Sequence, residues 1–186
     1  MTLKDMKEKT LQLIEEIDEE EEKLTSDPDI AAKMNAVINQ IQFELARIKK
    51  IAAFMTREVV KDEVLKLKEI ENFYQLKIMK FSDVSGEAKI YELFEDIAIF
   101  PTDGTVKIYY YKYPIVITND TDDSYEFELS QDVLEIMPYG VAADLLKSDV
   151  STNYGQIYQQ RYESMLQRLD PRNSTGSFFV EGGASI

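Results

Sequence analysis

The first 26 residues carry apolar side chains at alternating spacings of three and four residues, separated by charged ones. This spacing is typical of a helix with one narrow apolar stripe. The stripe is short and its neighbourhood at 19–22 is acidic, so we expect this acidic amphipathic helix (1–26) to pack on the rest of the chain or on a neighbouring subunit. The stripe consists of Leu3, Met6, Thr10, Leu13, Ile17, Glu20 and Leu24.

A second helix is predicted to begin at residues 27–29. Asp27 can cap it, Pro28 suits its first turn, and Asp29 complements the positive end of the helix dipole. Apolar positions then follow one helical face over 30–55, which predicts the longest buried element of the chain. The face includes two methionines that we interpret as core residues and not as a soft recognition surface. Its members are Ile30, Met34, Val37, Ile38, Ile41, Leu45, Ile48, Ala52 and Met55.

From residue 63 the apolar period changes toward two, which is typical of β-strands. Turn-forming sequences at 85–86 and 101–104 separate the predicted strands. We expect a small, mostly antiparallel sheet, with one helical turn at 69–75. The predicted strand positions are Val64, Leu65 and Leu67, then 77–81, 88–94, 96–100 and 105–113, with edge strands through Ile115, Ile117, Tyr125, Phe127 and Leu129.

The helical period returns after Leu129, with Ser130 as the expected cap. Pro138 and Gly140 interrupt this helix, so it must kink or begin again there. A last helix carries its stripe at Tyr154, Tyr158, Tyr162, Met165 and Leu169, and Asp170-Pro171 ends regular structure. We expect these two helices to form a hairpin against the sheet or the long second helix.

Together these elements predict an α+β fold: N-terminal helices, a small mostly antiparallel β-sheet, a C-terminal helical hairpin and an extended C-terminal arm. A chain of 186 residues suits one compact domain, which we place at 27–170, between the acidic helix and a flexible arm at 171–186. The arm holds one apolar segment among glycines and serines, suited to pairing with a sheet edge or groove of another chain. A disordered tail or a flap over the core is equally consistent with it. The segment is Ser177, Phe178, Phe179 and Val180.

The composition weighs against most enzyme classes. The chain has no cysteine and no histidine, so it lacks disulfides, thiolate metal sites and the side chain most often used as acid, base or zinc ligand near neutral pH. No apolar run is long enough for a signal peptide or a membrane span, so we expect a protein that is neither exported by that route nor bound in a membrane.

The net charge of -14 comes from two acidic surfaces. Residues 1–29 hold 11 acids and 4 bases, residues 119–135 hold 7 acids and no base, and the rest of the chain is balanced. Tight binding to nucleic-acid phosphates is therefore disfavoured. The one basic concentration is read as a solvated face, because acids interrupt it. It comprises Arg47, Lys49, Lys50, Arg57, Lys61, Lys66 and Lys68.

Three groups of residues in the sequence bear on possible chemistry. The acidic loop at 119–126 offers oxygen ligands for calcium at Asp120, Asp122 and Asp123, but it lacks the glycine and distant glutamate of an EF-hand, so an acidic turn is the favoured interpretation. Tyrosines at 109–113 could stack on nucleic-acid bases, although strand tyrosines usually pack or pair across a sheet. A carboxylate-dependent hydrolase is the weakest reading, since the acids lie in runs that look solvated.

Three segments of the chain resemble the head-to-tail adaptor (connector) proteins of tailed bacteriophages. They are the helix Ile30-Ala-Ala-Lys-Met-Asn-Ala-Val-Ile-Asn-Gln-Ile-Gln-Phe-Glu-Leu45, the strand and proline Val106-Lys-Ile-Tyr-Tyr-Tyr-Lys-Tyr-Pro114, and the closing helices at 134–146 and 154–169. Together they cover most of residues 30–170.

The resemblance implies a structural virion protein without catalysis or cofactor. It would form a dodecameric ring at the head-tail junction, after assembly in the bacterial cytoplasm, with the portal protein on one face and a stopper or tail protein on the other. DNA would pass through the ring without specific binding, and Phe178, Phe179 and Val180 would anchor the C-terminal arm to the portal. The alternative from another class is an acidic regulatory or DNA-mimic protein that occupies a partner's nucleic-acid site.

Overall fold

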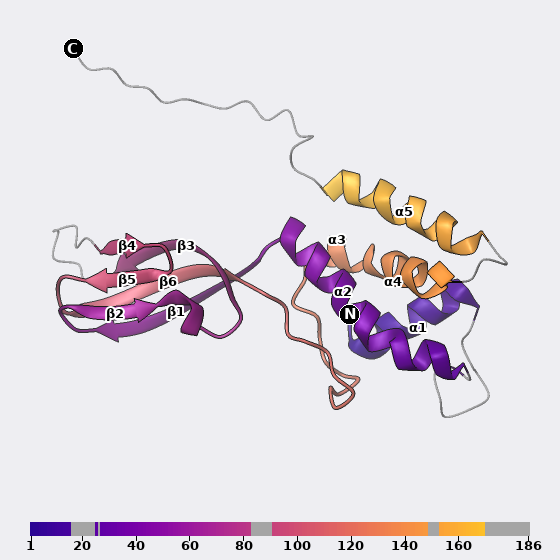
Figure 1. Cartoon of the computed structure of the whole chain (residues 1–186), viewed down its shortest axis with the longest axis horizontal. Helices are drawn as coiled ribbons and strands as arrows, with labels where there is room; N and C mark the ends of the chain where they lie inside the picture. Colours follow the sequence, from indigo (N-terminus) through magenta and orange to yellow (C-terminus); the bar gives the residue numbers. More distant parts are fainter. Residues whose placement is uncertain (16–24, 26, 83–90, 149–152, 170–186) are drawn as a thin grey trace, which may run out of the picture.

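The computed structural model describes residues 1–15, 25, 27–82, 91–148 and 153–169. The chain is elongated, with its helices gathered at one end and its strands at the other (Figure 1). We call these parts the helical body and the sheet body. The α+β class, with N-terminal helices, antiparallel sheets and a closing helical hairpin, is confirmed.

Both N-terminal helices begin at capping residues, of which the sequence predicted Asp27. Helix α1 (Leu3–Ile14) starts with a capping box between Thr2 and Asp5. Helix α2 (Pro28–Ile48) starts at Asp27, whose carboxylate accepts from the backbone amides of Asp29 and Ile30 at 2.8 and 3.2 Å. The α1 stripe is buried at Leu3, Met6 and Thr10, whereas its predicted continuation at 16–24 lies outside the described residues.

Helix α2 is shorter than predicted, because residues 51–55 belong to a strand. Strand β1 (Ile51–Val59) pairs antiparallel with β6 (Gly104–Lys112) along its full length, from Ile51 opposite Lys112 to Val59 opposite Gly104. The segment Ile51-Ala-Ala-Phe-Met55 satisfies a period of two as well as one of 3.6, so nine residues of strand pairing decide its conformation. The prediction that Ala52 and Met55 continue the helical face is wrong.

The sheet body consists of two three-stranded antiparallel sheets, in the orders β1-β6-β3 and β2-β5-β4. Its remaining strands are β2 (Glu63–Lys66), β3 (Phe73–Phe81), β4 (Glu92–Phe94) and β5 (Ile97–Phe100). The short helix between strands is a 3₁₀ turn at Leu67–Glu69 (η1), earlier than the predicted 69–75. Side chains from both sheets form one apolar cluster between them, which includes Leu65, Met79, Phe100, Val106 and Ile108.

The chain returns from β6 to the helical body through residues 113–130. The predicted edge strands in this segment are not formed, apart from one isolated bridge between Thr2 and Glu126. Side-chain amides of α2 take the place of a partner strand. Asn39 accepts from the Ile117 amide at 2.8 Å and donates to the Ile117 carbonyl at 2.7 Å, and Gln42 donates to the Ile115 carbonyl at 2.9 Å.

The closing helices confirm the predicted interruption. Helix α3 (Gln131–Leu134) follows Ser130, and the chain begins a new helix, α4 (Met137–Leu145), with Pro138 in its first turn. A 3₁₀ turn at Leu146–Ser148 (η2) leads toward α5 (Tyr154–Leu169). Helix α4 packs between α5 and the pair α1 and α2, so the hairpin covers the helical body and not the sheets (Figure 1).

The described chain has two hydrophobic clusters, one in each body. Near the connection between the bodies the ring of Tyr113 lies 5.8 Å from that of Phe43 and 4.8 Å from that of Tyr74, centroid to centroid. Lys112 forms an ion pair with Glu128 in the same region. Whether 27–170 acts as one domain stays a prediction, and the C-terminal arm at 171–186 lies outside the described residues.

Candidate functional site

The outer surface of sheet β1-β6-β3 combines lysines with aromatic and aliphatic side chains. The alternation along β6 buries Val106, Ile108 and Tyr110 between the sheets and turns Lys107, Tyr109 and Tyr111 to the other side. The register then aligns outward residues of β1 and β3 with them. We call this surface the lysine-aromatic face and define it by Lys50, Phe54, Lys77, Ile78, Lys80, Lys107, Tyr109 and Tyr111.

An apolar row crosses the middle of the lysine-aromatic face. Phe54 and Ile78 lie on either side of Tyr109 in the strand register, and the rings of Phe54 and Tyr109 are 6.0 Å apart. Phe54 is 68% exposed and Ile78 is 39% exposed, although both lie in regular strands. Apolar side chains left exposed together on a sheet are typical of a surface that another molecule covers.

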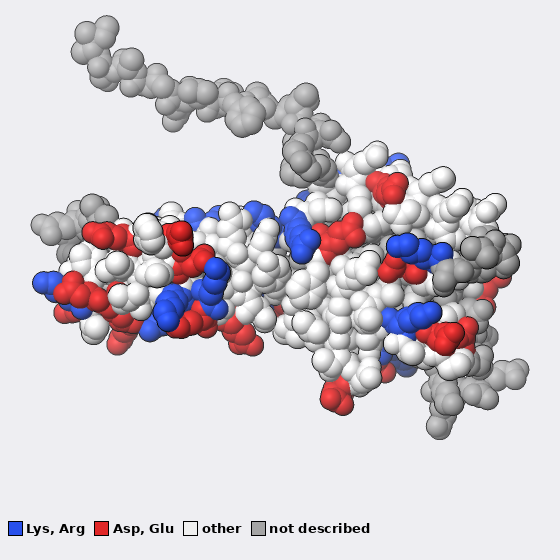
Figure 2. All heavy atoms as spheres, viewed as in Figure 1, with Lys and Arg blue, Asp and Glu red and all other residues white. Residues whose placement is uncertain are grey.

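Lysines stand on both sides of this row. The ammonium groups of Lys50 and Lys77 lie 5.0 and 5.9 Å from the ring centre of Tyr111. Beyond the row, Lys80 and Lys107 are directly opposite each other on adjacent strands, and both are exposed. None of these four lysines forms an ion pair with a carboxylate in the described part of the chain. In the view of Figure 2, basic side chains follow the rim of the sheet body near β3.

The pairing of Lys80 with Lys107 is unfavourable for the fold itself. Like charges directly opposite each other destabilise an antiparallel sheet. No acid lies in the same row, since the β1 residue opposite Lys107 is Thr56. The nearest acid in the outward register is Glu58, at the end of β1 opposite Thr105. An external anionic group is the kind of partner that would stabilise this pair.

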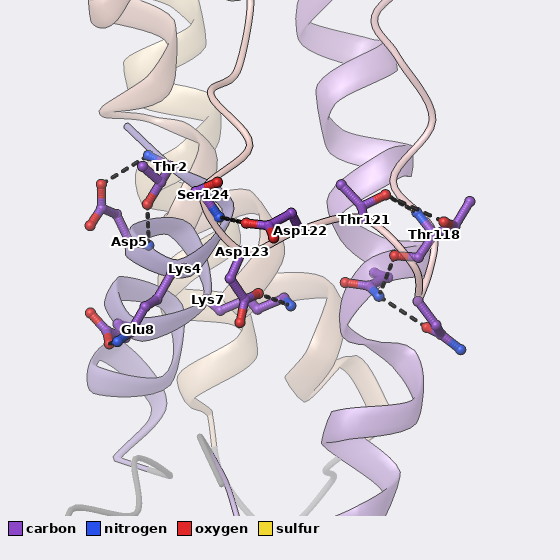
Figure 3. Close-up of polar contacts among 12 residues, drawn as sticks. Thr2, Lys4, Asp5, Lys7, Glu8, Thr118, Thr121, Asp122, Asp123 and Ser124 are labelled. Atoms are coloured by element: carbon purple, nitrogen blue, oxygen red, sulfur yellow. Dashed lines mark hydrogen bonds and ion pairs between the residues drawn. The ribbon is translucent and has the colours of Figure 1, made fainter. Parts of the chain in front are cut away.

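The acidic loop, residues 119–126, is held against both N-terminal helices (Figure 3). The backbone amides of Leu3 and Lys4 donate to the carbonyls of Tyr125 and Asp123 at 2.8 and 3.0 Å. The Asp123 carboxylate is paired with Lys7 at 2.8 Å. On the other side, Asn35 of α2 donates to the Asn119 side chain at 3.1 Å.

The three calcium candidates do not form a shared ligand group. Asp123 is paired with Lys7. The Ser124 hydroxyl and the Ser124 backbone amide, which donates at 2.7 Å, lower the pKa of Asp122. Asp120 is exposed. Within the described ranges, no three acidic, histidine or cysteine residues are close enough together to hold a metal ion.

The described carboxyl groups with a shifted pKa are shifted downward. Hydrogen bonds from Thr2, Val60, Ser124 and Ser130 are the main causes of the lowered pKa values of Asp5, Glu63, Asp122 and Asp132. A general acid near neutral pH needs the opposite shift. A cleft between α1 and α4 contains one carboxylate, Glu135, beside Lys9 and Tyr139. Asp5, Glu63, Asp122 and Asp132 therefore lack the raised pKa that the general acid of a hydrolase needs.

No protein-family model matches this chain, and no curated protein matches it either. In the described part of the chain, no helix has the length and apolar character needed to cross a membrane. Function is therefore inferred from the surfaces of the molecule.

Of the candidate residues that the sequence indicates, only some lie on the lysine-aromatic face. Tyr109 and Tyr111 lie on the lysine-aromatic face, whereas Tyr110 is buried and stacks on Phe73 at 5.8 Å. Acids pair with several residues of the basic concentration at 47–68: Arg57 pairs with Glu63, Lys66 with Glu69 and Lys68 with Asp96. The arm residues Ser177, Phe178, Phe179 and Val180 lie outside the described residues.

Sequence reasoning missed the lysines that matter most on this face, namely Lys77, Lys80 and Lys107. A signal was present in the alternation Lys107, Tyr109, Tyr111, which puts one lysine and two aromatic rings on the same side of a strand. The contribution of β3 depends on two register shifts between β3 and β6, at 73–75 and 76–78.

Proposed function

We propose that this protein is a non-catalytic structural subunit of a tailed-phage virion: the adaptor ring between the portal and the tail. In this role it works by presenting shaped surfaces to other proteins. Its partners are further copies of itself, the portal protein and a stopper or tail protein. DNA passes through the ring without specific binding, and the site of action is the virion neck.

The main support for this proposal is the lysine-aromatic face. It is an exposed sheet face with an apolar row, in which Phe54 and Ile78 are exposed, and four lysines without carboxylate partners in the described residues. Flat apolar and aromatic surfaces with a charged surround are typical of protein-protein interfaces. Small-molecule sites are usually concave instead.

The layout that underlies the resemblance also supports the proposal. The segments that carry it form α2, the strand β6 followed by the buried Pro114, and the hairpin of α4 and α5. The sheet body is inserted between α2 and the returning segment, so it projects from the helical body (Figure 1). A projecting module of this kind is suited to reaching a neighbour in an assembly.

Removal of the C-terminal arm tests the role in portal binding. A chain ending at residue 172 should keep the circular dichroism spectrum and melting temperature of the full chain, because the described core ends at Leu169. It should lose binding to the portal of the same phage in co-sedimentation. A second variant, which replaces Phe178, Phe179 and Val180 by serine in the full-length chain, should lose portal binding to the same extent. Portal binding that survives both changes would count against the anchoring role.

An acidic regulatory or DNA-mimic protein is the alternative, and the charge distribution favours it over an enzyme. Outside residues 50–113 the chain holds 24 acids against 11 bases. Such a protein would remain monomeric, would ignore the portal and would compete with DNA for a basic partner protein. Light scattering of the protein with and without portal separates the two functions.

A further inference from the structure

The two bodies of the chain differ sharply in charge. Residues 50–113, which contain the whole sheet body, hold 10 bases against 11 acids, a net charge of -1. The remaining residues carry -13 of the total -14, and those of them that the structure describes, in the helical body, hold 15 acids against 9 bases, a net charge of -6. A contact between two helical bodies brings like charges together, whereas a contact between a sheet body and a helical body largely avoids this repulsion.

Within the nearly neutral sheet body, the lysine-aromatic face is locally positive. Lys50, Lys77, Lys80 and Lys107 surround its apolar row, and Glu58 at one end is the acid in the same register. The opposed Lys80 and Lys107 contribute nothing favourable to the isolated sheet. These features indicate an acidic partner that also covers Phe54 and Ile78.

The acidic loop has the complementary properties. Its exposed acids are Asp120, Asp122, Asp123 and Glu126. Within the described residues, Asp123 forms an ion pair with Lys7, and the other three acids form none. Hydrogen bonds from α1 and α2 hold the loop in place, so little conformational entropy is lost when a partner binds it. The loop belongs to the helical body, and it lies beside α1 and α2 (Figure 3).

We propose that the lysine-aromatic face of one copy of this chain binds the acidic loop of a second copy. This inference rests on the proposed function, which requires self-association, and adds the surfaces that carry it. The two surfaces differ and lie on different bodies, so the contact is heterologous: each copy uses its face toward one neighbour and its loop toward the other. Such contacts repeat around an axis and form a ring when the rotation closes.

Single-stranded nucleic acid is a poorer occupant of the same face. Base stacking needs open ring faces. Here the ammonium groups of Lys50 and Lys77 lie over Tyr111, and Tyr109 packs against Phe54. The charge of -13 on the rest of the chain also repels a polyanion.

Charge reversal on each surface tests the proposed contact. The face variant carries Lys80→Glu and Lys107→Glu, and the loop variant carries Asp120→Lys and Glu126→Lys. All four side chains are exposed, so both variants should fold. Each variant alone should self-associate at least roughly tenfold more weakly than the wild type, by sedimentation velocity in the presence of portal, because like charges now face each other. An equimolar mixture should recover assembly, since each surface again meets its opposite.

The matched control, Lys61→Glu with Lys66→Glu, makes the same charge change on and beside β2 and should assemble as the wild type does. Two results would overturn the proposed contact: normal assembly of each variant alone, or a mixture that does not assemble although both variants keep wild-type circular dichroism spectra. Neither result would contradict the proposed ring function. A wild-type chain that never oligomerises, with or without portal, would overturn both. Binding of fluorescent oligothymidine that is lost only in the face variant would assign the face to nucleic acid and overturn the contact.

Discussion

Gly140 of α4 lies directly against the ring of Tyr162 of α5. A Cβ atom at position 140 would fall 2.8 Å from Cε2 of Tyr162 and 3.1 Å from Cγ2 of Ile41 in α2. Three helices of the helical body thus meet where only a hydrogen atom fits. The glycine interrupts the helical pattern in the sequence, but its structural reason is this close packing.

Replacement of Gly140 by alanine should destabilise the protein. The added methyl group forces a shift of the buried Tyr162 ring, which costs about 1–3 kcal/mol in a well-packed core, against a gain of up to about 1 kcal/mol in helix propensity. Thermal unfolding should show a melting temperature lower by a few degrees. Ser164→Ala, at an exposed site of α5, is the control and should change little. An unchanged melting temperature in Gly140→Ala would contradict the close contact.

The pH dependence of stability should reveal the burial of Tyr162. Burial raises the pKa of Tyr162, and the negative charge of Glu44 adds to the shift. The unfolded chain ionises this tyrosine near pH 10, whereas the folded chain keeps it neutral, so stability falls as the pH rises above about 10. Urea unfolding between pH 8 and pH 11 should show a smaller loss in Tyr162→Phe than in the wild type. An equal loss of stability in the wild type and in Tyr162→Phe would show that the ionisation of another group causes the pH dependence.

Asn39 should matter more for stability than its half-exposed position suggests. Its side chain makes both hydrogen bonds to the buried Ile117, so Asn39→Ala leaves a buried amide and carbonyl without partners. The expected loss is about 1–3 kcal/mol in urea unfolding. Hydrogen exchange at the Ile117 amide should accelerate in the same variant. Gln40→Ala, one position along α2 and exposed, should stay within about 0.5 kcal/mol of the wild type.

Local signals were enough to predict most helices and strands. The Asp27 cap and the restart at Pro138 depend on nearest-neighbour chemistry, and the alternation in β6 depends on a single strand, so the sequence predicts all three. The segment 51–55 could not be assigned in this way, because its pattern fits both a helix and a strand and its partner, β6, lies about fifty residues away. The segment 113–130 looked strand-like for a related reason. Its hydrogen bonds go to amides of α2, at Asn35, Asn39 and Gln42.

The candidate site was less predictable than the fold. The acidic loop is contiguous, so its charge was visible in the sequence, although its ion pair with Lys7 was not. The lysine-aromatic face combines three strands through a register that two irregularities in β3 adjust. A one-residue difference in that register would turn Lys80 away from Lys107.

Electron microscopy of the protein mixed with a tailed-phage portal protein from the same source can show whether the chain forms the proposed adaptor ring. We expect a closed ring on the tail-side face of the portal, coaxial with its channel, in which the sheet body of each copy contacts the acidic loop of the next. Portal rings that stay bare at saturating concentrations of the full-length chain would contradict it.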